Sequence, residues 1–188
     1  TIMKIIVLAG GLSTERDVSL ASAAGICRTL IEKGHDAFLL DVFLGLEHAP
    51  EHLEDVFTLP GHGLEIAKNI SCEEPDLAAV KASRPDQSDC FLGPNVIELS
   101  RLADITFLGL HGGEGENGKL QATFDLLGIR YTGSGYLGSA IAMDKGLSKQ
   151  LFWQNEVPTP AGFILRKGED ISLEAHGMTL PCVVKPCC

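Results

Sequence analysis

Residues Leu108–Gln121, LGLHGGEGENGKLQ, decide how the fold of this chain is interpreted. An apolar run from Ala103 to Leu110 leads into a loop with four glycines, and an apolar-periodic segment from Leu120 to Leu127 follows. This order predicts a strand, a tight polar loop and a helix. Glycines let a ligand approach the backbone closely, and a helix N-terminus favours an anionic group. The loop also carries His111 beside two carboxylates. The alternative is an acidic, solvated loop without a ligand.

A second strand, loop and helix begin the chain. Ile5–Leu8 is a continuous apolar run, typical of a parallel strand that is buried on both faces. Two glycines follow, then a helix expected over about 18–33 and a strand over 37–42, which together form a βαβ unit. Such a unit also occurs in nicotinamide-dependent dehydrogenases. The loop lacks their G-x-G-x-x-G pattern, however, and Asp41 is the one acidic residue placed to bind a ribose, so this alternative is remote.

Composition excludes several classes of partner. A formal net charge of −10 over 188 residues argues against nucleic acid and anionic membrane surfaces. No apolar run approaches the roughly 18 residues of a membrane span. Ile2–Leu8 is interpreted as a strand and not as a secretion signal, so a cytoplasmic protein is expected. The cysteines show no CxxC spacing and are expected to be buried, reduced thiols without assigned chemistry. They lie at positions 27, 72, 90, 182, 187 and 188.

Residues 43–95 carry little information on function. His48 and His52 lie among acidic residues, and His62 follows, so a metal site is conceivable. A solvated acidic helix is favoured, because no third ligand stands at a fixed spacing. Ser71–Asn95 is rich in Pro, Asp and Ser and is expected to be a loop-bearing insertion.

The remaining elements divide the chain near Gly133–Gly135. Before this point, a short helix is expected over 96–102 and a short strand over 129–132. After it, a long helix is expected over 137–155 with Asp144 and Lys145 in its middle. Strands over 161–165 and 181–186, with a short helix over 172–176 between them, complete the expected elements.

Five stretches together resemble the N-terminal half of D-alanine-D-alanine ligases, members of the ATP-grasp superfamily. Their order and number make the resemblance specific, and it covers nearly all of the chain, least well around 60–95. It implies an α/β fold: a Rossmann-like (pre-ATP-grasp) parallel sheet with helices on both faces over 1–135, and the start of an α+β ATP-grasp central subdomain over 136–188. The stretches are Gly10–Ser19, His111–Gln121, Gly128–Gly135, Met143–Lys145 and Val183–Pro186.

The resemblance implies an ATP-dependent, magnesium-requiring ligase that joins two D-alanines through an acyl phosphate. Its product serves peptidoglycan synthesis, and thereby cell-wall biogenesis and cell shape. Glu15 matches the family's acid near the amino group of the first D-alanine, and Val18 and Ser19 match residues that shape this pocket. His111 matches the imidazole near the carboxylate of the same substrate, so Glu15 and His111 are the expected catalytic residues.

Two lysines, Lys145 and Lys185, match those that meet the phosphates of ATP. Phosphoryl transfer needs cations where charge moves, and a carboxylate such as Glu15 binds a substrate ammonium strongly. Each residue also has a purely structural interpretation. Lys145 can be a helix surface charge, Lys185 a strand-end charge, Glu15 a first-turn residue and His111 a loop histidine.

In the family, the stretch around Lys185 is followed by a phosphate-closing loop, the magnesium ligands, a transition-state Arg and the adenine pocket. The chain ends at Cys188, so we expect an N-terminal fragment that is inactive alone. Residues 136–188 are expected to expose apolar faces. A D-alanine-D-lactate or D-alanine-D-serine ligase remains an alternative, as does a non-catalytic module that binds a small amino acid or a partner. The resemblance also implies a homodimer through the N-terminal domain.

Overall fold

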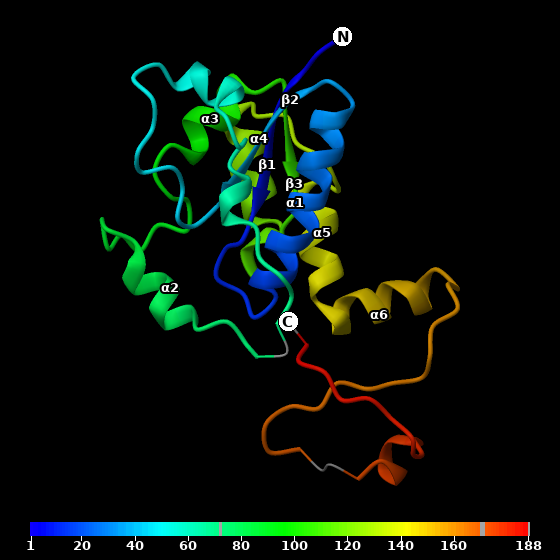
Figure 1. Cartoon of the computed structure of the whole chain (residues 1–188). Coiled ribbons are helices and arrows are strands. Elements are labelled where there is room, and N and C mark those ends of the chain that lie inside the picture. The colour runs from blue at the N-terminus through cyan, green and yellow to red at the C-terminus, as the bar shows by residue number, and fades with distance from the viewer. Residues whose placement is uncertain (72, 170–171, 188) are drawn as a thin grey trace.

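The computed structural model describes residues 1–71, 73–169 and 172–187. At its centre lies a parallel sheet of strand order β2-β1-β3 (Figure 1). β1 (Lys4–Ala9) pairs on one side with β2 (Asp36–Asp41) and on the other with β3 (Ile105–Leu108). Outside β3, the expected strand over 129–132 is reduced to a single parallel bridge between Thr106 and Tyr131.

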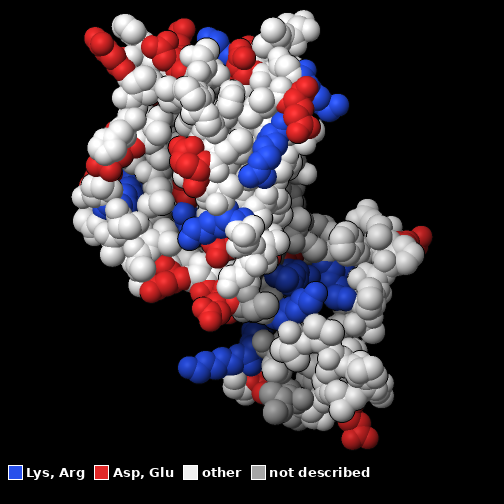
Figure 2. All heavy atoms as spheres, in the orientation of Figure 1, with Lys and Arg blue, Asp and Glu red and all other residues white. Residues whose placement is uncertain are grey.

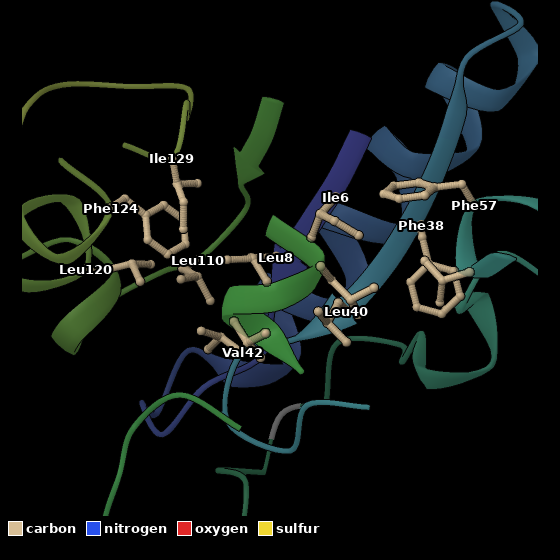
Figure 3. Close-up of a cluster of buried hydrophobic side chains, with 13 residues drawn as sticks. Ile6, Leu8, Phe38, Leu40, Val42, Phe57, Leu110, Leu120, Phe124 and Ile129 are labelled. Carbon is tan, nitrogen blue, oxygen red and sulfur yellow. The ribbon is translucent and has the colours of Figure 1, made fainter. Parts of the chain in front are cut away.

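Alternating side chains of the strands feed two cores. Ile5 and Val7 point to the face covered by α1 (Arg16–Glu32), where Leu20 and Cys27 are buried. Ile6, Leu8, Phe38 and Leu40 point to the opposite face (Figure 3). That face is covered by η1 (Leu53–Thr58), α3 (Val96–Leu102) and α4 (Lys119–Leu127). Because both faces of the sheet are covered, the run Ile5–Leu8 is apolar at every position. The expected α/β fold with both faces of the sheet covered is confirmed.

The segment over 43–95 differs from its prediction. In place of an acidic helix around His48 and His52, it forms two 3-10 turns, η1 and η2 (Leu64–Ile66), and a short helix, α2 (Leu77–Ser83). Val56 and Phe57 explain the difference, because both are almost completely buried against the sheet and fix the local path of the chain. In the part of the chain that the structure describes, no group of three or more His, Cys, Asp or Glu is placed to hold a metal ion.

The long helix expected over 137–155 is two helices. α5 (Tyr136–Met143) ends before Asp144, and α6 (Lys145–Gln154) begins after it. Asp144 has extended backbone angles, and its side chain accepts a hydrogen bond from the backbone N–H of Leu147 at 2.8 Å. Asp144 is therefore an N-cap and not a mid-helix residue.

The strands expected over 161–165 and 181–186 are also absent. These segments are irregular, and a short 3-10 turn, η4 (Glu174–His176), lies between them. A strand needs a hydrogen-bonded neighbour, and no described strand lies beside either segment. None of the helices in the described ranges is long and apolar enough to span a lipid bilayer.

The cysteines fit their prediction only in part. Cys27 is buried, and burial raises the pKa of its thiol to about 11. Cys90 is exposed, while Cys182 and Cys187 are partly exposed, and all four are free thiols. The expectation of burial is therefore wrong for Cys90. Cys72 and Cys188 lie outside the described residues.

Candidate active site

Two loops lie side by side at the carboxyl edge of the sheet. One follows β1 and the other follows β3, and these strands are parallel neighbours. The Ser19 hydroxyl joins them: it donates to the carbonyl of Gly109 at 2.7 Å and accepts from the N–H of Gly10 at 3.0 Å. Ser19 is fully buried, so its hydroxyl fixes the spacing of the two loops from inside the protein. Val18, the residue before it, is exposed.

Ser13 forms the second link between the loops. Its hydroxyl donates to the carbonyl of His111 at 2.6 Å and accepts from the N–H of Glu15 at 3.2 Å. Gly112 has a φ of +71°, and a Cβ at this position would lie 2.8 Å from a carboxylate oxygen of Glu15. The structure thus brings Glu15 and His111, 96 positions apart in the sequence, to one place, with the Glu15 side chain lying against backbone that has no side chain to obstruct it.

The ring of His111 contacts helix α1. Its Nε2 lies 3.1 Å from the hydroxyl of Ser22, which is also 3.2 Å from the carbonyl of Ser19. Ser22 has no place in the sequence-based prediction. The available signal is its position three residues after Ser19, which places both on the same side of the helix.

A buried ion pair between Arg16 and Asp41 holds the first loop in place. Arg16 and Asp41 are 4% and 3% exposed, and the guanidinium donates to one Asp41 oxygen and, at 2.8 Å, to the carbonyl of Gly11. The other Asp41 oxygen accepts from the N–H groups of Phe43 and Leu44. Both carboxylate oxygens of Asp41 thus accept hydrogen bonds inside the protein. Asp41 is not available to bind a ribose, which the dehydrogenase alternative requires.

The second loop is held from its other end by α4. The buried side chain of Gln121 donates to the carbonyl of Gly115 at 2.9 Å. Asn117 accepts from the N–H of Lys119 at 3.1 Å, and the Lys119 ammonium lies 3.1 Å from Glu114. The loop thus satisfies the N–H of Lys119, the first helical residue of α4, whose N-cap residue Gly118 has no capping side chain.

Lys145 and Lys185 lie on adjoining segments away from these loops. The N–H of Lys145 donates to the carbonyl of Cys187 at 2.9 Å, so the chain around Lys185 passes the start of α6. The pKa of Asp144 is held below its usual value, first by the Leu147 N–H and next by the Cys187 thiol. Both lysine side chains are exposed. Figure 2 shows Lys and Arg side chains gathered in the area of α6, whereas acidic side chains are scattered over the sheet domain.

The geometry thus forms two groups. Glu15, Val18, Ser19 and His111 share the carboxyl edge of the sheet, and Lys145 and Lys185 share the start of α6. Among the residues that the structure describes, no hydrogen bond or ion pair joins either lysine side chain to Glu15 or His111. A parallel sheet with helices on both faces and polar loops at its carboxyl edge is a Rossmann-like α/β domain, and in such sheets the carboxyl edge is where ligands bind.

Comparison with known proteins identifies the family. A family model described as the D-ala D-ala ligase N-terminus matches residues 4–134, and the chain belongs to this family. Over 186 residues it is 42% identical to the D-alanine--D-alanine ligase of Lacticaseibacillus casei, covering 98% of this chain and 51% of that protein. It is 43% identical to that of Pediococcus pentosaceus over 187 residues, covering 98% and 52%. The chain thus spans about half the length of these curated relatives.

A solved structure shares the fold. The D-alanine--D-alanine ligase from Bacillus anthracis, crystallised in complex with ATP, superposes with a TM-score of 0.57 and 24% sequence identity. The match covers 93% of this chain and 42% of that one. The family match confirms the sequence-based assignment to the D-alanine-D-alanine ligases, and the solved structure confirms the fold.

Proposed function

We propose that this chain supplies the first D-alanine site and part of the phosphate site of an ATP-dependent ligase that makes D-alanyl-D-alanine for peptidoglycan. The observation that carries the proposal is the junction of the two loops, where Glu15 lies against Gly112, next to His111. A carboxylate and an imidazole at the carboxyl edge of a parallel sheet suit a small zwitterion, whose ammonium and carboxylate need separate partners.

In this proposal, Glu15 accepts hydrogen bonds from the ammonium of the first D-alanine, and His111 stands near its carboxylate. Val18 offers its exposed apolar side chain to the methyl group, and Ser19 sets the distance between the loops. The carboxylate of the first D-alanine takes the γ-phosphoryl group of ATP. The resulting acyl phosphate is then attacked by the amine of a second D-alanine. The amide bond forms as phosphate leaves, and ADP is the other product.

Lys145 and Lys185 bind the ATP phosphates in this scheme. They lie on adjoining segments of a protein whose formal net charge is −10, so local cations are needed to hold a polyanion. Magnesium accompanies ATP, but the described residues hold no cluster suited to a metal. We therefore propose that its protein ligands lie outside them.

We also propose a cytoplasmic location and a homodimer for the protein. The ATP requirement and the four free thiols of the described ranges agree with a cytoplasmic protein. A homodimer through residues 1–135 is what the resemblance to the family implies, and we retain it as a proposal.

The test is D-alanine binding to this chain, followed by amide chemical shifts. D-alanine at millimolar concentration is expected to shift resonances of the loops at 10–19 and 109–118, and L-alanine is expected to shift them far less. Glu15→Gln should weaken binding at least about tenfold, the cost of one charge-assisted hydrogen bond. Glu32→Gln, at the other end of the same helix, should leave binding unchanged.

Equal shifts by both enantiomers, or binding that survives Glu15→Gln, would contradict the assigned site. Phosphate release from MgATP by the chain alone is expected not to depend on D-alanine. D-alanine-dependent release that is lost in Lys185→Ala would contradict our view that the chain is inactive by itself.

A further inference from the structure

The imidazole of His111 is held by helix α1 as well as by its own loop. Ser13 fixes the backbone carbonyl of His111, and Ser19 fixes that of Gly109, two residues earlier. With the backbone held on both sides, the ring has little freedom beyond its own side-chain torsions. The contact from Ser22 to Nε2, at 3.1 Å, then determines how the ring is turned.

We propose that Ser22 is a positioning residue that holds His111 in the tautomer with the proton on Nε2, leaving Nδ1 free to face the substrate. The biochemical meaning of this inference rests on the proposed D-alanine site. Its physical basis is the hydrogen-bond geometry of three serines around one histidine.

The serine hydroxyl has one proton and two neighbouring acceptors. It lies 3.2 Å from the carbonyl of Ser19 and 3.1 Å from Nε2 of His111, and it can donate to only one of them. Serines inside helices donate readily to the carbonyl three or four residues earlier. When Ser22 donates to Ser19, its lone pair faces His111, so Nε2 has to carry the proton and donate.

The other ring nitrogen is left for a ligand. Within residues 1–71, 73–169 and 172–187, no hydrogen-bond partner is present for Nδ1 of His111. In the neutral ring, Nδ1 presents a lone pair, so it donates to the carboxylate of D-alanine only when the ring is charged, a state in which Nε2 still donates to Ser22. Without Ser22, the neutral ring can exchange its two tautomers and rotate. Nε2 is then no longer always the donor, and Nδ1 is no longer always the acceptor.

The test reads the tautomer directly from nitrogen chemical shifts of the chain labelled with ¹⁵N-histidine. Spectra are recorded at increasing pH until the nitrogen shifts of His111 no longer change, so that the neutral ring is the species observed. Wild-type His111 is expected to show one tautomer, with Nε2 protonated. Ser22→Ala is expected to shift it to the tautomer mixture shown by exposed His48 in the same spectrum.

Two variants make the result specific. Ser22→Thr keeps the hydroxyl and should restore the single tautomer. Thr29→Ala removes another hydroxyl of α1 that donates back to its helix, at 3.0 Å to Gly25, and should change nothing at His111. Ser22 is exposed and alanine is a good helix former, so Ser22→Ala is expected to fold. A wild-type ring protonated on Nδ1, or a tautomer population that is unchanged in Ser22→Ala, would overturn the proposal.

Binding provides a second readout. Ser22→Ala is expected to weaken D-alanine binding about three- to tenfold, with rescue in Ser22→Thr. The tautomer measurement needs no substrate, so the two proposals fail separately. A single tautomer that depends on Ser22, in a chain that does not bind D-alanine, would uphold the positioning role and reject the proposed function.

Discussion

At the residue scale, Gly10 marks the point where the first loop approaches buried charge. Its φ is +74°, a left-handed conformation that costs other residues about 1–2 kcal/mol. A Cβ on Gly10 would lie 2.3 Å from a carboxylate oxygen of Asp41 and 2.9 Å from a guanidinium nitrogen of Arg16. The position therefore combines backbone strain with a collision against an ion pair that has no space to move.

Gly10→Ala is expected to lower the free energy of unfolding by at least about 2 kcal/mol, because displacement of a buried ion pair adds to the backbone strain. Gly25→Ala is the matched control. Gly25 lies within α1, and a Cβ there would meet nothing within 4 Å. This variant should raise the free energy of unfolding by about 0.5–1 kcal/mol. Urea denaturation followed by circular dichroism measures both, and similar effects of the two substitutions would contradict this account.

At the element scale, the division between α5 and α6 depends on one carboxylate. The pKa of Asp144 lies below its ordinary value of 3.8, chiefly because its ionised form accepts a hydrogen bond from the Leu147 N–H. The folded pKa is lower than the unfolded one, so the cap is fully formed above about pH 4 and is lost as the pH falls through the folded pKa.

Acidification below pH 4 is therefore expected to fray the first turn of α6, seen as a shift of the Leu147 amide resonance towards its random-coil position. Asp144→Asn keeps a capping oxygen but removes the titrating group. Its Leu147 amide should stay in place over the same pH range, and a shift equal to that of the wild type would show that another group controls the turn.

The elements that were predicted well carry their signals locally. α3 matches its predicted range, and α1 and α4 start within two residues of theirs, because apolar periodicity and glycine stops act within one segment. The break at Asp144 was missed because the apolar pattern continues across it. The absent strands over 161–165 and 181–186 were mispredicted because an apolar run does not say whether a partner strand exists.

The candidate site divides in the same way. The loops around Glu15 and His111 could be found from their glycines, and their placement at one edge follows from parallel strands. The contact between Ser22 and His111 spans 89 residues, so no local pattern indicates it. The roles of Ser13 and Ser19 as links between the loops likewise required the structure.

At the scale of the whole molecule, apolar side chains are distributed unevenly. Among the residues that the structure describes, the buried hydrophobic ones all lie between Ile5 and Ile129. Over 136–169 and 172–187, large apolar side chains are exposed instead, among them Trp153 at 50% and Val184 at 90%. The first part of the chain thus holds the core, and the second part contributes little to it.

Limited proteolysis is expected to cut after Gly135 first and to leave a resistant product close to residues 1–135. Segments without buried apolar contacts open at low free-energy cost, and their backbone reaches the protease. Mass spectrometry of the products identifies the sites. A chain prepared as 1–135 should unfold in urea with the same midpoint as the whole chain, since both have the same core. First cuts within 1–135, or equal resistance along the chain, would contradict this division.

The strand order β2-β1-β3 also affects synthesis on the ribosome. β1 and β2 are synthesised early. β3 can pair with β1 only after residues 42–104, which separate β2 from β3, have been added. At ordinary rates of translation this takes about 3–13 seconds. Throughout that interval, Ile5–Leu8 forms an unpaired, apolar strand edge, the kind of surface that joins other chains. The central strand of the finished sheet is therefore the segment that a nascent chain most needs a chaperone to cover.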